Sequence, residues 1–149
     1  MNTIFFAEKE IEVSSFSAWT ALTEMSNWLT RLHSISMIDY DKKHSFFVEG
    51  REYKVLTPEK ITMTSQLVKI NEKQMMVTIQ AHFFVLHSQL VCKVIPLNAT
   101  KCLITRKQEY LGLVGKIFAT LFKKREGNET NEYLMEWERY AISSLLNDC

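Results

Sequence analysis

Hydrophobic and polar residues follow two different periods along the chain. In residues 4–13 they alternate with a period of two, which predicts a β-strand. Phe16, Trp19 and Leu22 then lie three residues apart and so share one face of a helix. A second short apolar group, at residues 25–32, follows a polar break. The N-terminal part therefore predicts one strand followed by two short helices.

From residue 34 to residue 110 the period of two returns. Polar turns divide this region into six predicted strands, at residues 34–40, 46–56, 60–70, 75–86, 89–95 and 101–110. The clearest alternation predicts one buried strand face, formed by Val77, Ile79, Ala81, Phe83 and Val85. Because the turns are too short to hold crossover helices, neighbouring strands are expected to be antiparallel.

Residues 113–147 have the composition of a helix rather than a strand. As one straight helix this segment would be about 52 Å long, whereas a domain of this size has a diameter of about 38 Å. The apolar stripes before and after Gly127 are out of phase, and the residues around it are poor helix formers. The sequence therefore predicts a long C-terminal helix with a kink near Gly127.

The predicted order is strand, two short helices, six antiparallel strands and a long helix. A seven-stranded antiparallel sheet with helices on one side is an α+β architecture. The chain has 149 residues, no internal repeat and no linker-like segment. It is therefore expected to form a single domain over residues 1–149.

The net charge of the chain bears on the kinds of partner that it can bind. The chain has 18 Lys and Arg residues against 17 Asp and Glu residues, a formal net charge of +1. A protein that holds nucleic acid by its phosphates normally shows a clustered basic excess. The one basic run, at residues 123–125, is interpreted as a solvated helix face. We therefore expect no nucleic-acid partner.

Other features of the sequence bear on its location. The first residues show no basic segment followed by an apolar stretch, and no apolar run approaches the roughly 20 residues that span a bilayer. The three cysteines, Cys92, Cys102 and Cys149, are odd in number and widely spaced, which is typical of a reducing compartment. These observations predict a cytoplasmic protein without integral membrane association.

The sequence contains few patterns that indicate catalysis or metal binding. It has no HExxH, paired CxxC, GxSxG or phosphate-binding glycine loop. His82 and His87 are five residues apart on one expected strand, which would place them on opposite faces. No metal site and no cofactor are expected.

Four polar residues on otherwise apolar strands are the candidates for chemistry in an interior cavity: Arg51, Tyr53, His82 and Arg106. Such groups can polarise a carbonyl or move a proton. Alternatively they face solvent or pair with glutamates on neighbouring strands, as is normal for the polar face of an antiparallel sheet. Arg51 and Tyr53 are two residues apart, so both are expected on one face of a strand.

The order of several short motifs resembles the START-like superfamily of polyketide cyclases/dehydrases and lipid transport proteins. The motifs are IEVS at 11–14, AWTAL at 18–22, Trp28, Gly50, NAT at 98–100 and YLG at 110–112. They extend over essentially the whole chain, although the proline that many relatives carry after Trp28 is absent. The resemblance implies a helix-grip (START/Bet v 1-like) fold, in which a curved sheet surrounds the C-terminal helix.

That fold implies an apolar cavity between the curved sheet and the C-terminal helix. The resemblance also implies that Trp19 anchors the first short helix in the core and that Trp28 lies near the cavity mouth. The residues expected to line the cavity are Trp28, Met37, Phe46, Val48, Met63, Leu67, Val77, Ile79, Phe83, Ile117 and Leu121.

The resemblance implies that the protein binds a small hydrophobic ligand or lipid, which would be desolvated in this cavity. One alternative is a polyketide cyclase/dehydratase-like enzyme that uses the four polar candidates. A second alternative is a protein-binding adaptor of the chaperone-activator type, without a ligand. The identity of the ligand, any reaction and the oligomeric state do not follow from the sequence.

Overall fold

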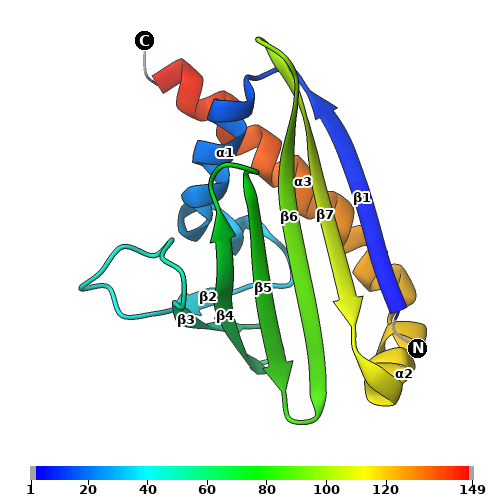
Figure 1. The fold of residues 1–149 in the computed structure, drawn as a ribbon. Coiled ribbons are helices and arrows are strands. Elements are labelled where there is room, and N and C mark those ends of the chain that lie inside the picture. Colours follow the sequence, from blue (N-terminus) through cyan, green and yellow to red (C-terminus); the bar gives the residue numbers. More distant parts are fainter. Residues whose placement is uncertain (1–2, 148–149) are drawn as a thin grey trace.

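Seven antiparallel strands form one curved sheet, and a long helix lies across one face of it (Figure 1). This computed structural model describes residues 3–147, so Cys149 lies outside the described residues. In spatial order the strands are β1 (Thr3–Ile11), β7 (Lys101–Tyr110), β6 (Leu86–Asn98), β5 (Met76–Phe83), β4 (Thr62–Asn71), β3 (Glu52–Leu56) and β2 (Met37–Asp39). The predicted seven-stranded antiparallel sheet is therefore confirmed.

The strands from β2 to β7 form a meander in which each strand pairs with the next one in sequence. The first strand, β1, instead pairs with the last, β7. Between β1 and β2 in sequence lie α1 (Ser15–Thr23) and two 3₁₀ turns, η1 (Met25–Asn27) and η2 (Leu29–Arg31). The second predicted short helix is thus a pair of 3₁₀ turns.

The N-terminal helix is fixed at both ends by local hydrogen bonds. Ser14 caps α1, since its side-chain Oγ accepts a hydrogen bond from the backbone N–H of Ser17 at 3.1 Å. Trp28 lies between η1 and η2, and its indole Nε1 donates to the carbonyl of Ala21 at 2.9 Å. This bond ties the 3₁₀ turns back onto α1.

The turn between β5 and β6 corrects the prediction for the two histidines. The strand predicted to run to residue 86 ends at Phe83, and Phe84 takes a left-handed backbone conformation with φ of 52°. His82 and His87 are therefore opposite each other on adjacent strands, with stacked rings 5.7 Å apart, rather than on opposite faces of one strand. Apolar residues occupy this turn, so the alternation gave no sign of it.

The strand predicted at residues 46–56 begins only at Glu52. Gly50, with φ of 90°, departs from the extended conformation, and its N–H donates to the carbonyl of Leu67 at 2.6 Å. On β4 the pairing shifts between Leu67 and Lys69. Residues 40–51 consequently form an irregular segment, called here the mouth segment, beside the end of β3.

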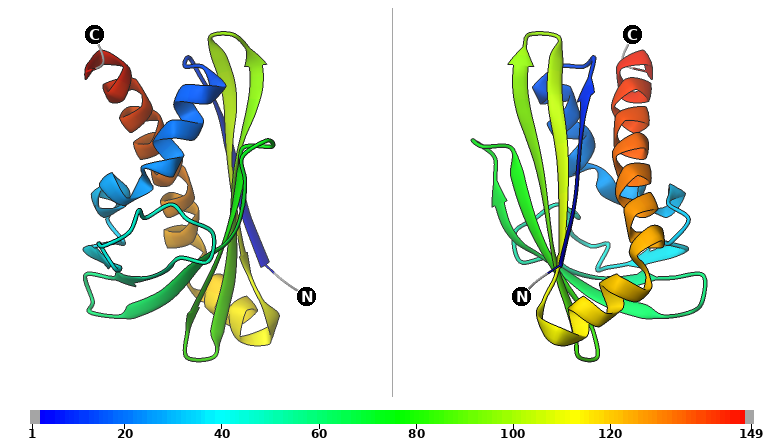
Figure 2. Two further views of the ribbon diagram at one scale, coloured as in Figure 1. Left: turned by 60° about the vertical axis from the view of Figure 1, so that its left-hand side comes forward. Right: turned by 90° about the vertical axis from the view of Figure 1, so that its right-hand side faces the viewer.

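The C-terminal helix is interrupted earlier than predicted. It consists of α2 (Gly112–Leu121) and α3 (Lys123–Asn147), so the break lies at Phe122 and not near Gly127. At Phe122 the backbone leaves the helical conformation, with φ of −114° and ψ of 24°. The break is needed because α2 packs at the end of the sheet whereas α3 crosses its face, so the chain changes direction between them (Figure 2). At the start of α2 the packing is close, since a Cβ on Gly115 would lie 2.8 Å from the backbone carbonyl carbon of Tyr110.

The core lies between the sheet and the layer formed by α1 and α3, which are on the same face of the sheet (Figure 2). Trp137 of α3 is fully buried, and its Nε1 donates to the carbonyl of Ala18 at 2.8 Å. Trp28 packs edge-on against Tyr133 of α3, with ring centroids 5.1 Å apart. Large side chains thus fill this part of the space in which the sequence resemblance implied a cavity.

Candidate functional site

Buried polar side chains gather where β3, β6 and β7 face the N-terminal half of α3. We call them the polar cluster, and they are Tyr53, Cys92, Arg106, Gln108, Glu126, Thr130 and Tyr133. The strand residues reach this place because alternate side chains of a strand point to the same face. The helix residues reach it because positions three and four apart in a helix share one face.

Arg106 is the central residue of the polar cluster and is only 4% exposed. Its Nη1 donates to Thr130 Oγ1 at 2.8 Å, and its Nη2 donates to Gln108 Oε1 at 3.3 Å. Its guanidinium carbon lies 4.7 Å from the centroid of the Tyr133 ring. Within residues 3–147 no carboxylate forms an ion pair with Arg106, and its buried Nε has no hydrogen-bond acceptor. The site therefore contains a buried cation with an unused donor.

Three neutral groups belong to the same polar cluster as this cation. The thiol of Cys92 donates to the hydroxyl of Tyr133, with 3.7 Å between sulfur and oxygen. Burial raises the pKa of Cys92 to about 11, although the positive charge of Arg106 acts in the opposite direction. Burial likewise raises the pKa values of the Tyr53 and Tyr133 hydroxyls above the usual value for tyrosine. At neutral pH these groups can exchange hydrogen bonds with a ligand but carry no charge.

Glu126 provides the polar cluster with a group that titrates near neutral pH. It lies in the first turns of α3 and is 5% exposed. Burial and the negative charge of Glu129 raise the pKa of Glu126 to about 7. The guanidinium of Arg125 lowers it less, with 3.8 Å between Arg125 Nη2 and Glu126 Oε1. Near pH 7 this carboxyl therefore exists as a mixture of its protonated and ionised forms.

The mouth segment closes the side of the site formed by β2 and β3. Phe46 is buried, and its ring packs edge-on between Tyr40, at a centroid distance of 4.8 Å, and Tyr53, at 4.9 Å. Tyr53 therefore contacts the mouth segment on one side and belongs to the polar cluster on the other.

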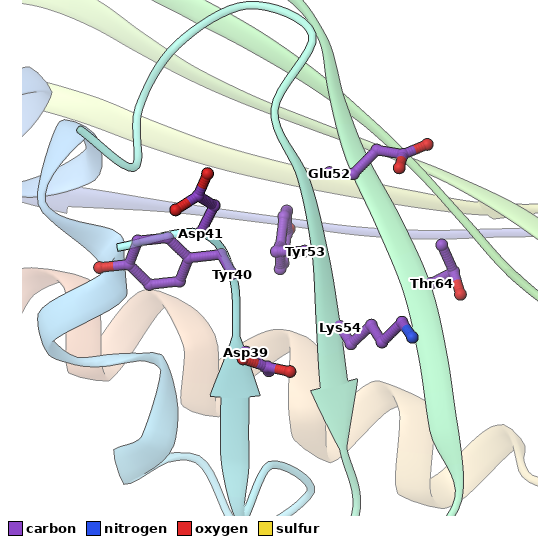
Figure 3. A pocket seen from close by; sticks show the side chains of 7 residues that line it. All are labelled: Asp39, Tyr40, Asp41, Glu52, Tyr53, Lys54 and Thr64. Carbon is purple, nitrogen blue, oxygen red and sulfur yellow. The ribbon is translucent and has the colours of Figure 1, made fainter. Parts of the chain in front are cut away.

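Two open depressions flank the mouth segment. The first has a volume of about 380 Å³ (Figure 3), and its lining residues are Asp39, Tyr40, Asp41, Glu52, Tyr53, Lys54 and Thr64. The second has a volume of about 420 Å³ and includes Phe46 and Phe47 in its lining. The aromatic contacts of Phe46 thus lie between these two depressions and the polar cluster.

The structure separates the four polar residues proposed from the sequence. Tyr53 and Arg106 point into the interior, whereas His82 is exposed on the hairpin of β5 and β6. Arg51 precedes β3 and is half-buried, and its Nη2 donates to the carbonyl of Ser45 at 2.8 Å within the mouth segment. Only two of the four therefore share one site.

The eleven residues expected to line a cavity fall into three groups. Phe46, Trp28, Leu67, Val77 and Ile79 are buried in the core. The half-buried residues are Met63 and Phe83, and the exposed ones are Met37, Val48, Ile117 and Leu121. The last two are exposed because they belong to α2, which packs at the end of the sheet and does not lie across its face. Trp28 is fully buried against Tyr133 and is not at a mouth.

Reasoning from the sequence missed Cys92, Gln108, Glu126, Thr130 and Tyr133. A signal for part of this set was present, because alternate residues of β7 from Cys102 to Tyr110 are all buried. Extending that alternation through Arg106 assigns Gln108 to the interior as well. The sequence indicated the helix residues less clearly, because the face of α3 that points toward the sheet depends on where the helix breaks.

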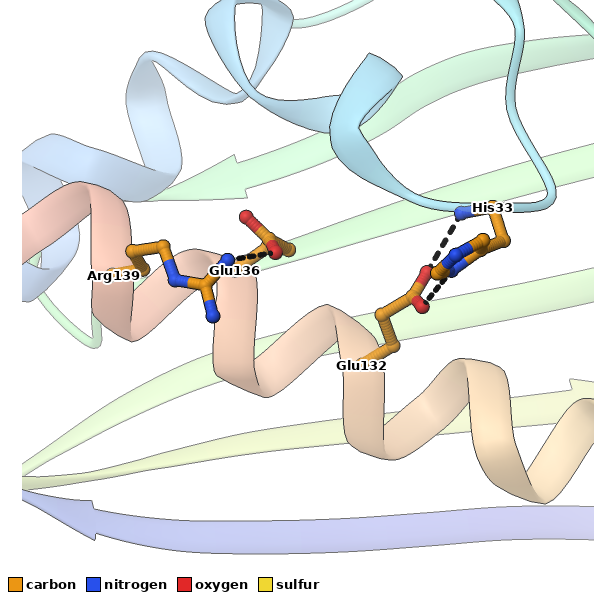
Figure 4. Close-up of polar contacts among 4 residues, drawn as sticks. All are labelled: His33, Glu132, Glu136 and Arg139. Atoms are coloured by element: carbon orange, nitrogen blue, oxygen red, sulfur yellow. Dashed lines mark hydrogen bonds and ion pairs between the residues drawn. The ribbon is translucent and has the colours of Figure 1, made fainter.

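A second polar contact holds the chain after η2 against α3 (Figure 4). The backbone N–H of His33 donates to Glu132 Oε1 at 2.7 Å, and its ring Nδ1 contacts the other oxygen of this carboxylate. The hydrogen bond to Glu132 raises the pKa of His33 above its usual 6.5. One turn further along α3, Arg139 Nη1 donates to Glu136 Oε1 at 2.8 Å. The His33 contacts fix the loop to the helix, whereas the Arg139–Glu136 contact lies within α3; both are outside the polar cluster.

Residues 3–147 contain no group of three or more His, Cys, Asp or Glu side chains arranged to hold a metal ion. In the same range, no helix combines the length and the apolar character that crossing a bilayer requires.

Comparison with known proteins assigns the fold. No family model and no curated protein matches the sequence. The structure is similar to norcoclaurine synthase from Thalictrum flavum in complex with dopamine and hydroxybenzaldehyde, with a TM-score of 0.74, 13% identity, and coverage of 99% of this chain and 88% of that one. It is also similar to the Zhui aromatase/cyclase from Streptomyces sp. R1128, with a TM-score of 0.71, 9% identity, and coverage of 93% and 95%.

A third similar structure is a hypothetical protein from Helicobacter pylori, with a TM-score of 0.79, 11% identity, and coverage of 93% of this chain and 88% of that one. The chain has the Bet v 1-like helix-grip fold. The fold class predicted from the motifs is therefore confirmed. In this helix-grip fold the polar cluster lies between the sheet and the long helix.

Proposed function

We propose that this helix-grip protein binds a small hydrophobic molecule between the sheet and α3, with an oxygen of that molecule accepting a hydrogen bond from Arg106. The observation that carries the proposal is the buried guanidinium, which has neutral partners and an unused Nε. A buried charge without a counter-charge costs several kcal/mol, roughly, so an acidic or carbonyl oxygen brought by a ligand would stabilise it.

The mouth segment is the proposed route of entry. It contains no helix or strand, and Phe46 is the side chain through which it fills the space beside Tyr53. Movement of Phe46 would join the depression beside Tyr40 and Tyr53 to the interior. The apolar body of the ligand would then contact the buried side chains of Leu67 and Ile79. Transfer of this apolar surface from water to the protein interior favours binding.

Two fluorescent probes of similar shape test the role of Arg106. One is 1-anilinonaphthalene-8-sulfonate, which carries an anionic oxygen group, and the other is the neutral N-phenyl-1-naphthylamine. We expect both to bind, and we expect Arg106→Met to weaken binding of the anionic probe about tenfold or more and to leave the neutral probe unchanged. Lys107→Met is the matched control, because it removes the same charge from the exposed face of the same strand.

Each outcome of this titration has a defined meaning. Equal loss of both probes in Arg106→Met, with native near-UV circular dichroism, would show that Arg106 does not orient a ligand. Failure of the wild-type protein to bind either probe, together with native mass spectra free of co-purified small molecules, would contradict ligand binding altogether. The adaptor hypothesis would then account better for the filled interior.

A second candidate function is catalysis on a carbonyl compound. The observation that favours it is the presence of Glu126, with a pKa near 7, in the same polar cluster as Arg106. A carboxyl with such a pKa suits proton transfer at neutral pH, and a guanidinium suits polarisation of a carbonyl. The test is turnover of aromatic polyketide-like carbonyl compounds, with a rate that follows the ionisation of Glu126 and is abolished in Glu126→Gln.

A further inference from the structure

One end of the molecule carries a group of exposed apolar side chains, which we call the apolar end. Its members are Phe84, Val85, Leu113, Val114, Ile117 and Leu121. On α2, Leu113 is 74% exposed, Ile117 53% and Leu121 73%. In the turn between β5 and β6, Phe84 is 81% exposed and Val85 69%. Side chains of this size are seldom left in water as a group, so such a group indicates an interaction surface.

The fold brings the two parts of the apolar end together. The backbone N–H of Leu111 donates to the carbonyl of His87 at 3.0 Å, which places the start of α2 beside the β5–β6 hairpin. Figure 1 shows both at the same end of the molecule. The inner face of α2 is already buried through Gly115 and Ala119. The outward face, with Leu113, Ile117 and Leu121 spaced four apart, therefore has no place in the core.

The two segments that form the apolar end contain basic but no acidic residues. Residues 110–125 include Lys116, Lys123, Lys124 and Arg125, all of them exposed, and contain no Asp or Glu. Residues 82–87 contain no acidic residue either. The Arg125 guanidinium lies 4.6 Å from the centroid of the Phe122 ring, so positive charge borders the apolar surface directly. Since the whole chain has a net charge of only +1, this segment is a local concentration of positive charge.

Carboxylates near this segment offset the charge of Arg125 but not that of the lysines: Glu126 Oε1 lies 3.8 Å from Arg125 Nη2, and within residues 3–147 no ion pair includes Lys116, Lys123 or Lys124. Glu126 is buried, and Glu109 and Glu129 are half-buried. Burial and the charge of Glu129 favour the protonated form of the Glu126 carboxyl up to about pH 7. The exposed surface of the apolar end is therefore apolar in its centre and basic at its border.

From this arrangement we infer that the apolar end docks on a bilayer containing anionic phospholipid. Leu113, Ile117 and Leu121 would enter the boundary between headgroups and acyl chains, and the lysines of residues 116–124 would lie at the phosphates. Exposed apolar residues combined with Lys and Arg are the pattern of helices that lie in a membrane interface. The inference goes beyond the proposed function and holds whether or not the interior binds a ligand.

A bilayer fits this surface better than a second copy of the chain does. In a two-fold symmetric dimer the same patch meets itself, so the basic border of one copy would face the basic border of the other. Like charges placed against each other in an interface disfavour association. An anionic surface satisfies both the apolar centre and the basic border.

Vesicle flotation tests the inference, with phosphatidylcholine vesicles that contain or lack phosphatidylserine. We expect the wild-type protein to float with the anionic vesicles, to remain largely unbound with the neutral ones, and to dissociate as salt is raised. Lys123→Glu with Lys124→Glu is expected to lower the bound fraction to about a tenth or less. These exposed lysines can be changed without disturbing the core.

A second pair of variants tests the apolar component. Ile117→Asp with Leu121→Asp is expected to abolish flotation. Leu97→Asp with Leu146→Asp is the matched control, because these exposed leucines belong to the last residues of β6 and of α3, and the ends of both elements lie opposite α2 (Figure 1). The inference would be overturned if neither the two lysine substitutions nor Ile117→Asp with Leu121→Asp changed the fraction of protein that floats. A concentration-dependent dimer that Ile117→Asp with Leu121→Asp converts to monomer would also overturn it, since the surface would then be a contact between copies.

Discussion

The two halves of α3 are buried to a similar degree but by different chemistry. In the C-terminal half, the buried Trp137 donates its indole N–H to the carbonyl of Ala18 in α1, and two glutamates are paired, Glu136 with Arg139 and Glu138 with Lys9. In the N-terminal half, Glu126 and Thr130 meet Arg106 of β7. The C-terminal half joins α3 to α1 and β1, whereas the N-terminal half faces a buried guanidinium with an unused donor and no ion pair among the described residues. Function is therefore to be sought in the N-terminal half of α3.

The largest expected effect concerns the C-terminal half of α3. Trp137→Ala removes a fully buried indole and leaves the carbonyl of Ala18 without its donor. We expect it to lower the free energy of unfolding by about 3–5 kcal/mol, measured by urea denaturation. Leu146→Ala, at an exposed position of the same helix, should change the free energy of unfolding by less than about 0.5 kcal/mol. A similar small loss for both would mean that this half of α3 does not stabilise the fold.

The mouth segment should show a smaller loss of stability combined with a gain in binding. Phe46→Ala removes the ring between Tyr40 and Tyr53, which is expected to lower the free energy of unfolding by about 3 kcal/mol. It also frees space beside Tyr53, so the neutral probe should bind more tightly than to the wild type. Weaker binding of the neutral probe to Phe46→Ala, in a folded sample, would contradict entry by this route.

Glu126 makes the N-terminal half of α3 dependent on pH. Its pKa is raised in the folded state from the usual 4.5 to about 7, so its stabilising contribution is fully present below about pH 4.5 and is lost as pH rises through about 7. Glu126→Gln cannot ionise. We expect it to be more stable than the wild type at pH 8 by about 2 kcal/mol, and by much less at pH 5, in paired urea denaturations. An equal difference at both pH values would show that Glu126 has an ordinary pKa.

The smallest expected effect concerns the contact between His33 and α3. Because the pKa of His33 is raised, its interaction with Glu132 is fully present below about pH 6.5 and is lost as pH rises through that raised pKa. The ring is exposed, so the effect is best measured by NMR titration of the imidazole. Glu132→Gln should move the midpoint back toward 6.5. An unchanged midpoint would show that the Glu132 carboxylate does not influence the titration of His33.

Much of the fold could be predicted from the sequence, because it depends on local patterns. The period of two across residues 34–110 and the short turns predict an antiparallel meander, and the apolar spacing before Trp28 predicts α1. The break at Phe122 could not be predicted in this way, because it depends on α2 packing at the end of the sheet and α3 crossing its face (Figure 2), which no local pattern in the sequence specifies. The hairpin turn at Phe84 was also missed, since its residues are as apolar as those of a strand.

Less of the candidate site than of the fold could be predicted from the sequence. Composition identifies Arg106 as unusual on an apolar strand, but whether it faces solvent or the interior depends on the register of β7 with β1 and β6. The partners of Arg106 on α3 depend on where the helix breaks. The interior is also filled in a way that no strand pattern indicates, because Phe46 reaches it from an irregular segment.

The pairing of β1 with β7 has a consequence for how the chain matures. Thr3 lies opposite Tyr110, and Ile11 lies opposite Cys102, so β1 is synthesised before the other six strands of the sheet, whereas its partner β7 is synthesised after all of them. Until then one edge of the growing meander is uncovered and the N-terminal strand is unpaired. Sheet closure is thus a late, long-range event in biogenesis, and this interval is when nascent chains of this protein are most prone to associate with one another.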